Sequence, residues 1–372
     1  MVADDMYLGD DDSRGLANDD RQQSMSGDDR RRVNADRRRP EIAIVRYREC
    51  QLAAVYGLTD VFRVAEEQLA LVGRGGEGAR VSHWEWSDDG VVCTFDSDPG
   101  TPNAPTHVVF PPSLVPPQGM DAAHALRDWA LLRRDEGAVL CGLCAGVFVL
   151  AETGLLDHRR ATTHWAFAEE FARRFPAVRL DARRMVVDEG DVITAAGIMA
   201  WLDFGLSLVE SMFGPSMMIR TSRFMLADAP RTDQLPYMGQ LPSATHDDEV
   251  VRLAEETIDR QLGSAMTLSG LAAATSTHPR TLQRRFKAAT GKTVTQYVQC
   301  LRVERANHAL ATTDDTFESI ARSVGYDDPT TLRRLILRET GLTPTGYRQK
   351  FGAKSLVGGR GQTLVGGRIQ RR

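Results

Sequence analysis

The sequence predicts an α/β domain followed by an all-α domain. Between residues 41 and 227, short apolar runs alternate with amphipathic stretches, as is typical of strands and helices that follow one another along the chain. Between residues 249 and 351, one set of helical signals occurs twice, with Thr281 of the first copy matching Thr331 of the second. The chain has 372 residues, of which 42% are hydrophobic, so it is long enough to bury two separate cores.

The elements of the α/β domain alternate in type along the chain. Strand-like runs occur near residues 42–45, 91–95, 108–110, 138–140, 185–187 and 192–194. Helix-like stretches occur near residues 55–71, 122–134, 147–153, 164–175 and 200–213. Strands that are followed by helices favour right-handed crossovers and parallel pairing. We therefore expect a mostly parallel sheet covered on both faces, which is a flavodoxin-like α/β sandwich.

The sharpest local feature of this domain is the segment 138–152, which we call the elbow. An apolar run ends, small residues form a turn that presents Cys144, and a helix begins. Such a turn places the sulfur near backbone N–H groups and a helix N-terminus, which favour a thiolate and bound anions. We expect a small-molecule effector pocket at Cys144, Ala145 and His164, at the carboxyl ends of the strands. A small anionic or polar metabolite, such as an amino-acid derivative, fits that chemistry.

Cysteine usage and hydropathy indicate the compartment. The five cysteines form no pairing pattern, which fits a reducing environment. Cys141 and Cys144 form a CxxC, but zinc needs a second pair of ligands and none is evident, so we expect no metal and no cofactor. No apolar stretch is long enough to span a bilayer, and the start of the chain is acidic rather than signal-like. These features predict a cytoplasmic protein that does not contact the membrane.

Three segments lack the pattern of a folded core. Residues 1–40 mix runs of aspartate and arginine with almost no large apolar residues, which predicts disorder. Residues 228–248 contain three prolines and are expected to form a linker. Residues 352–372 repeat the sequence Leu-Val-Gly-Gly-Arg and are expected to form a basic, flexible tail. The α/β domain is thereby assigned to residues 41–227 and the all-α domain to residues 249–351.

The duplicated pattern of the all-α domain indicates two helix-turn-helix units. In each copy a short helix pattern precedes a turn and an arginine-rich helix. Leu282 and Phe286 lie one turn apart and can pack inward, as can Leu332 and Ile336 in the second copy. Helix ends are marked in both copies. Asp328-Pro329 fits a helix start, and Gly291 and Gly341 fit helix stops.

The outward side chains of the two arginine-rich helices suit DNA. They are Arg280, Gln283 and Arg284 in the first copy, and Thr330, Thr331, Arg333 and Arg334 in the second. Arginine can donate two hydrogen bonds to the edge of guanine, and glutamine can form two hydrogen bonds with the edge of adenine. Residues 250–351 hold fifteen Lys and Arg against ten Asp and Glu, although the whole chain has a net charge of -4. The alternative is a helical bundle whose arginines are merely solvated.

Residues 250–351 resemble the DNA-binding domain of AraC/XylS-type transcriptional regulators. The resemblance rests on Gly341-Leu-Thr-Pro344-Thr-Gly-Tyr347-Arg348, preceded by Ala321-Arg-Ser-Val-Gly325-Tyr326. It implies that the second helix of each unit enters the major groove of double-stranded DNA, in successive turns on one face of the duplex. It also implies a joining helix over residues 294–311. One departure is Leu337, where the family usually has a basic residue, so a phosphate contact is weakened there.

The elbow resembles the nucleophile elbow of the PfpI/ThiJ-like, class I glutamine amidotransferase-like superfamily. The segment from Gly154 to the Thr163-His164 pair strengthens this resemblance. Regulators that join such a domain to an AraC-type domain form the GlxA-like group, which this chain resembles over residues 41–351. The resemblance implies a transcriptional regulator that senses a small-molecule effector and forms a homodimer.

The same resemblance argues against catalysis. Ala145 stands where hydrolytic members of the superfamily carry histidine, and Ala54 stands where their acid falls. Only Asp60 or Glu49 could replace that acid. We therefore expect no enzymatic turnover and no catalytic residue, with Cys144 serving as a ligand contact, a redox sensor or a structural element. The alternative is a PfpI/ThiJ-like cysteine hydrolase or deglycase with an accessory DNA-binding module.

Overall fold

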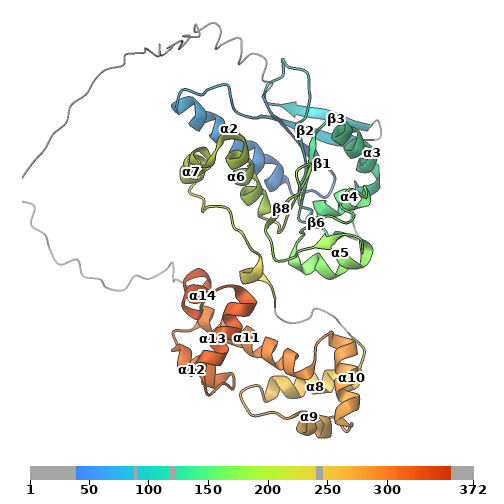
Figure 1. The fold of residues 1–372 in the computed structure, drawn as a ribbon, viewed down its shortest axis with the longest axis vertical. Helices are drawn as coiled ribbons and strands as arrows, with labels where there is room; N and C mark the ends of the chain where they lie inside the picture. Colours follow the sequence, from blue (N-terminus) through green and yellow to red (C-terminus); the bar gives the residue numbers. More distant parts are fainter. Residues whose placement is uncertain (1–38, 88–89, 118–121, 240–245, 353–372) are drawn as a thin grey trace, which may run out of the picture. The chain divides into compact units, whose positions relative to one another are not determined.

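The computed structural model describes residues 39–87, 90–117, 122–239 and 246–352 (Figure 1). The segments predicted to be disordered (1–40) and tail-like (352–372) lie outside the described residues, apart from residues 39, 40 and 352. The remainder forms an α/β domain followed by an all-α domain, which confirms the predicted fold class.

A seven-stranded sheet forms the centre of the α/β domain, with strand order β3-β2-β1-β4-β5-β9-β8. The inner pairings, from β2 through β9, are parallel, whereas β3 and β8 pair antiparallel at the two edges. The prediction of a mostly parallel sheet is confirmed. The strands are β1 (Glu41–Arg46), β2 (Arg80–Ser87), β3 (Gly90–Asp96), β4 (His107–Phe110), β5 (Val139–Leu143), β8 (Val186–Asp188) and β9 (Val192–Ala195). A separate two-stranded sheet contains β6 (Arg160–Ala161) and β7 (Arg179–Leu180).

Strand β2 was absent from the sequence prediction because polar residues interrupt its apolar pattern. Arg80, Ser82 and His83 are all at most 3% exposed. Arg80 pairs with Asp96 and Glu41, and the Ser82 hydroxyl donates to Glu41 Oε1 at 2.6 Å. Buried polar groups are stable where their hydrogen bonds are satisfied, and these bonds come from distant parts of the chain.

Helices cover both faces of the sheet (Figure 1). One face carries α2, α6 and α7, which pack against one another, and the other carries α3 and α4. Helix α7 was not predicted; it starts at Pro215, directly after Gly214 breaks the preceding helix with a φ of 93°. The helices are α2 (Leu52–Leu71), α3 (Ala122–Asp135), α4 (Gly146–Glu152), η2 (Trp165–Phe167), α5 (Ala168–Arg174), α6 (Ala200–Phe213) and α7 (Pro215–Phe224).

The first part of the expected linker belongs to the α/β domain. Gln234, just before the short helix η3 (Leu235–Tyr237), is only 2% exposed. Its Nε2 donates to the Thr163 carbonyl at 2.9 Å, and its Oε1 accepts from the Trp165 backbone N–H at 3.0 Å. Arg231 forms a two-pronged ion pair with Asp203. The assignment of residues 228–248 to a linker is therefore wrong for residues 231–237; residues 240–245 are not described.

The all-α domain has two separate apolar cores. The first contains Leu282 and Phe286, and the second contains Leu332 and Ile336, all fully buried. One long helix, α11, contributes its first half to one core and its second half to the other. The helices are α8 (Glu249–Arg260), α9 (Leu268–Ala274), α10 (Pro279–Thr290), α11 (Val294–Thr312), α12 (Phe317–Ser323), α13 (Pro329–Thr340) and α14 (Pro344–Phe351).

The duplicated sequence signals form duplicated structure. Helices α10 and α13 both end at a left-handed glycine, Gly291 with a φ of 71° and Gly341 with a φ of 70°. Asp328 caps α13 by accepting from the Thr330 backbone N–H at 2.9 Å, and Pro329 occupies the first turn. These predicted helix boundaries are confirmed, so α9–α10 and α12–α13 form two helix-turn-helix units.

Candidate functional site

Helix α10 brings its three predicted DNA contacts to one surface. Arg280, Gln283 and Arg284 are exposed, while Leu282 and Phe286 are buried on the other side of the helix. Together with neighbouring side chains, the three line a shallow groove of about 570 Å³. The other lining residues are His278, Thr281, Lys287 and Thr293. The groove offers three cations and an amide, which is the donor set that base edges and phosphates require.

Arg285 is adjacent in sequence but has a different role. Its guanidinium donates to both carboxylate oxygens of Asp248, with Nε–Oδ2 at 2.8 Å and Nη2–Oδ1 at 2.7 Å. The Asp248 carboxylate also caps α8 by accepting from the Val251 backbone N–H. The hydrogen bond from Arg285 holds the pKa of Asp248 below its usual value. Arg285 therefore ties α10 to the start of α8.

Helix α13 presents its predicted contacts less freely. Thr330, Arg333 and Arg334 are exposed, but the Arg333 guanidinium lies over the Phe317 ring, 5.4 Å from its centroid. Thr331 is half-buried, and its hydroxyl donates to the Asp328 carboxylate at 3.1 Å. Part of this set therefore stabilises the start of the helix and its packing on α12.

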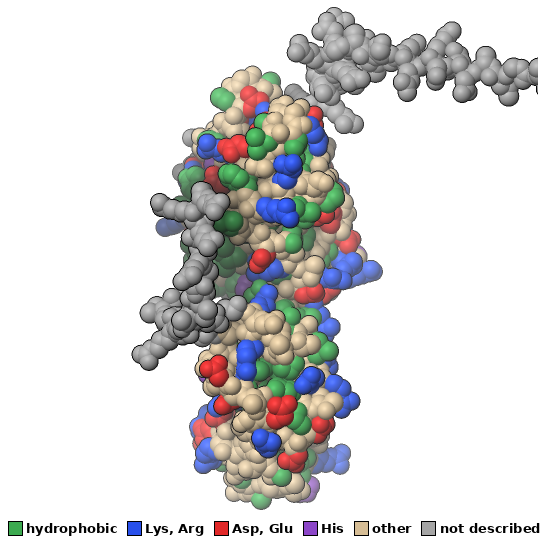
Figure 2. Space-filling model, turned by 90° about the vertical axis from the view of Figure 1, so that its left-hand side faces the viewer, with side chains coloured by type: hydrophobic (Ala, Val, Ile, Leu, Met, Phe, Trp, Pro, Cys, Tyr) green, Lys and Arg blue, Asp and Glu red, His purple; other side chains and the backbone are tan. Residues whose placement is uncertain are grey.

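The two recognition surfaces also differ in charge. Leu337 is 47% exposed at the position where the first copy has Lys287. Figure 2 shows Lys and Arg side chains scattered among acidic ones on the visible face. Helix α13 therefore lacks the cation that α10 carries at this position.

The elbow has the predicted strand-turn-helix geometry. Cys144 lies between β5 and α4 with a φ of 55°, a strained value for a residue other than glycine. Gly146 permits the close approach of α4 to the end of β4, because a Cβ there would lie 2.3 Å from the Phe110 carbonyl oxygen. Glycine is therefore required directly after Ala145.

The thiol of Cys144 is buried and is not activated as a nucleophile. It is 2% exposed, and the backbone N–H groups of Ala145 and Gly197 donate toward its sulfur. Burial outweighs these donors and raises the pKa of the thiol to about 12, so the thiol is protonated at neutral pH. The expectation that the elbow favours a thiolate is wrong, because the turn is covered.

His164 lies at a small pocket of about 160 Å³. Burial lowers the pKa of His164, and its Nδ1 accepts from the Ala166 backbone N–H at 3.1 Å. The ring is therefore neutral at physiological pH, with its proton on Nε2. The pocket is lined by His164, Trp165, Met185, Ala196, Gly197, Ile198, Met199, Arg231, Gln234 and Tyr237.

Only one of the three predicted effector residues lines this pocket. Cys144 and Ala145 are not among its lining residues, although the N–H of Gly197, which does line it, donates toward the Cys144 sulfur. Arg231 is the cation of the lining, and Asp203 already pairs with it. Sequence reasoning missed Arg231 and Gln234 because both come from the segment assigned to a linker.

Neither carboxylate considered for catalysis is among the groups that shift the pKa of Cys144, which are its burial and the backbone N–H groups of Ala145 and Gly197. Asp60 is exposed on α2, and Glu49 is half-buried beside Tyr47 and Cys50. Over the described ranges, no cluster of three or more His, Cys, Asp or Glu side chains is arranged to hold a metal ion. Over the same part of the chain, no helix combines the length and apolar character needed to cross a membrane.

The raised pKa of Cys144 predicts low reactivity. At pH 8, moving a thiol pKa from 9.0 to about 12 lowers the thiolate fraction about a thousandfold. Native protein treated with iodoacetamide should therefore be alkylated at Cys144 at least about a hundredfold more slowly than at the partly exposed Cys93. Mass spectrometry over time measures both rates, and the two should converge in urea. Equal rates in native protein would show that the elbow opens to solvent.

Comparison with known proteins identifies both domains. Residues 271–350 match the model of a helix-turn-helix domain, and residues 114–211 match the DJ-1/PfpI family. The chain is 28% identical over 231 residues to the HTH-type transcriptional regulator CdhR of Pseudomonas aeruginosa, covering 62% of this chain and 65% of that protein. It is 26% identical over 218 residues to the HTH-type transcriptional regulator GlxA of Rhizobium meliloti, covering 58% of this chain and 67% of that protein.

A shorter match involves an enzyme. The chain is 39% identical over 72 residues to the isonitrile hydratase of Pseudomonas putida, covering 19% of this chain and 30% of that protein. The longer matches pair the chain with regulators rather than enzymes. The chain therefore combines a DJ-1/PfpI-family domain with an AraC-type helix-turn-helix domain, and its relatives are transcriptional regulators of the GlxA and CdhR type.

Proposed function

We propose that this protein is a transcriptional regulator that binds specific sites on double-stranded DNA. The observation that carries the proposal is the duplicated display of exposed donors on α10 and α13, each helix being anchored in its own core. The names of the relatives CdhR and GlxA support the same function. The chain spans about 65% of the length of CdhR.

In this proposal α10 contributes more to the recognition of the DNA sequence than α13 does. Arg280, Gln283 and Arg284 read base edges in one major groove, with Lys287 placed to meet phosphate. Thr330 and Arg334 of the second set are exposed, while Thr331 and Arg333 also hold α13 in place. The first unit then supplies most of the sequence discrimination.

We propose that the α/β domain binds an effector without turnover. The match to isonitrile hydratase favours the enzyme alternative, but a cysteine nucleophile needs an activated thiolate and a base. Here the Cys144 thiol is protonated and Ala145 follows it. The neutral His164 lies at the pocket with its Nδ1 already occupied by a backbone N–H. These features suit ligand contact better than proton transfer.

The proposed effector site is the pocket beside His164, and Cys144 adjoins it because the N–H of Gly197, a lining residue, donates toward the Cys144 sulfur. The donors of its lining are the Nε2–H of His164 and the Arg231 guanidinium, which Asp203 and Tyr237 hold in place. A small polar or anionic metabolite, such as an amino-acid derivative, matches these donors. It alters DNA binding only if it favours one arrangement of the protein over another.

We further propose a homodimer formed through the α/β domain. Helices α2 and α7 pack together and leave Tyr56 51% exposed and Phe224 60% exposed. Sedimentation equilibrium of the full chain should give twice the monomer mass, and combining Tyr56→Glu with Phe224→Glu should return it to the monomer mass. Val92→Glu, on the exposed edge strand β3, is the control and should leave the dimer intact. A monomeric wild-type chain would refute this part of the proposal.

The DNA-binding proposal is tested by comparing two cations of α10. Arg284→Ala should weaken binding to the preferred site by about 1–3 kcal/mol and change binding to random duplex little, because a base contact is lost. Lys287→Ala should weaken binding to both duplexes about equally, because a phosphate contact carries no sequence information. Fluorescence anisotropy at fixed salt measures both. Equal losses on the two duplexes for Arg284→Ala would assign that residue to phosphate.

The effector proposal is tested with a panel of amino acids and their derivatives in thermal-shift experiments. Ligands that raise Tm for the wild-type chain should do so less for His164→Ala, which removes a lining donor, and for Cys144→Ala, which removes the acceptor of the Gly197 N–H and so loosens the lining at Gly197. Both variants should keep basal DNA binding. Cys93→Ala, on the edge strand β3, should behave as wild type. An unchanged ligand response in both pocket variants would place the effector site elsewhere.

A further inference from the structure

Arg302 occupies the one place where α11 passes from the first core to the second. The preceding residue, Leu301, is buried in the first core, and the following residue, Val303, is buried in the second. The two cores share no buried apolar residue among those described. Apolar packing therefore leaves the two helix-turn-helix units connected mainly through α11 itself.

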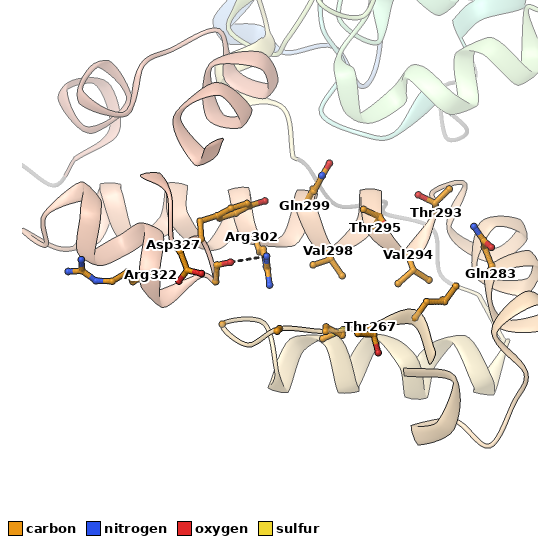
Figure 3. Close-up of a pocket in the computed structure, with 16 residues that line it drawn as sticks. Thr267, Gln283, Thr293, Val294, Thr295, Val298, Gln299, Arg302, Arg322 and Asp327 are labelled. Carbon is orange, nitrogen blue, oxygen red and sulfur yellow. Dashed lines mark hydrogen bonds between the residues drawn. The ribbon is translucent and has the colours of Figure 1, made fainter. Parts of the chain in front are cut away.

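The guanidinium of Arg302 connects the two units directly. Its Nε donates to the Leu262 carbonyl at 3.1 Å, and its Nη2 donates to the Ser264 carbonyl at 3.1 Å, both just after α8 in the first unit. Its Nη1 donates to the Gly325 carbonyl at 3.1 Å, in the turn of the second unit (Figure 3). We call residues 262–264, 302 and 323–326 the joint.

The joint is built to fit arginine. The guanidinium also lies over the Tyr326 ring, 5.1 Å from its centroid. A planar group with donors in fixed directions can reach three carbonyls at once while stacking on a ring, whereas the lysine ammonium is a point charge on a flexible stem. Because the three acceptors are main-chain carbonyls, the contact fixes backbone positions in both units.

Two glycines allow the backbones to meet. A Cβ on Gly263 of the first unit would lie 2.7 Å from the Ser323 carbonyl oxygen of the second. A Cβ on Gly325 would lie 2.7 Å from Arg302 Nη2 and 3.0 Å from the Leu262 carbonyl oxygen. A groove of about 540 Å³ borders the joint, and Gly263, Arg302 and Gly325 are among its lining residues (Figure 3). The joint is thus a narrow, tightly fitted contact beside open space.

We propose that Arg302 is a positioning residue that sets the spacing between the two stretches of DNA bases the protein reads. The inference rests on the proposed DNA-binding function. Two recognition helices that enter successive major grooves must match the helical repeat of about 10–10.5 bp. A rigid joint makes the protein intolerant of other spacings, whereas a loosened joint lets α10 and α13 adapt to them.

The experiment uses the full chain and a duplex selected by the wild-type protein from a random pool. Variants of that duplex add or remove one or two base pairs between the two recognised stretches, and another variant retains only the stretch read by α10. Wild type should lose tenfold or more in affinity for each changed spacing. Arg302→Ala and Arg302→Lys should lose less than about threefold between spacings, while binding the single stretch within about twofold of wild type.

Arg305→Ala is the matched control. Arg305 lies one turn further along α11 and pairs with Asp259 of the first unit at 2.6 Å, and both side chains are more than half exposed. This variant should keep the wild-type spacing profile. The single-stretch duplex shows whether each variant is folded, and Arg302→Lys provides a milder change if the alanine variant is unstable.

Each outcome separates the two proposals. A wild-type spacing profile in both Arg302 variants overturns the positioning role, as does an equal loss at every spacing, which indicates a purely stabilising contact. In both cases the proposed DNA-binding function stands, because the wild-type chain still selects its site. A wild-type chain that selects no duplex overturns the proposed function and the positioning role together.

Discussion

The all-α domain depends on one helix burying its sides in two different cores. Successive residues of an α-helix are about 100° apart around its axis, so Leu301 and Val303 point in nearly opposite directions. Each helix-turn-helix unit is completed by one half of α11 and would lack part of its core without it. Each recognition helix packs its apolar side into the core that α11 completes. Its polar side is therefore left exposed, which places the polar groups of α10 and α13 on the surface.

In the α/β domain the comparable constraint is the close packing of backbone segments against one another at the carboxyl ends of the strands. The elbow brings α4 against the end of β4, and the segment around Gln234 covers the region from another direction. Covering the turn removes water from Cys144 and leaves a small pocket beside His164. One geometry therefore both suppresses thiolate chemistry and forms a cavity of the size of a small metabolite.

Local patterns in the sequence predicted most of the fold. The helix boundaries at Asp328 and Gly341 and the inward positions of Leu282 and Phe286 depend on neighbours within one or two turns, so they could be found without a structure. Strand β2 could not, because its buried Arg80 is stabilised by Glu41 and Asp96 from other strands. The pocket could not either, since its lining joins residues as far apart as His164 and Tyr237.

The predicted DNA contacts show the same division. Periodicity separates Arg284 from the buried Phe286, but only the structure shows that Arg285 is held by Asp248 and Arg333 by the Phe317 ring. The base contacts of Arg280, Gln283 and Arg284 stay predictions.

Burial in the elbow protects the Cys144 thiol from oxidants. Peroxides attack thiolates, and a thiol with a pKa of about 12 that is 2% exposed offers them almost none. The proposed effector response would then be insulated from the oxidant level of the cell, although a cysteine lies at the centre of the domain.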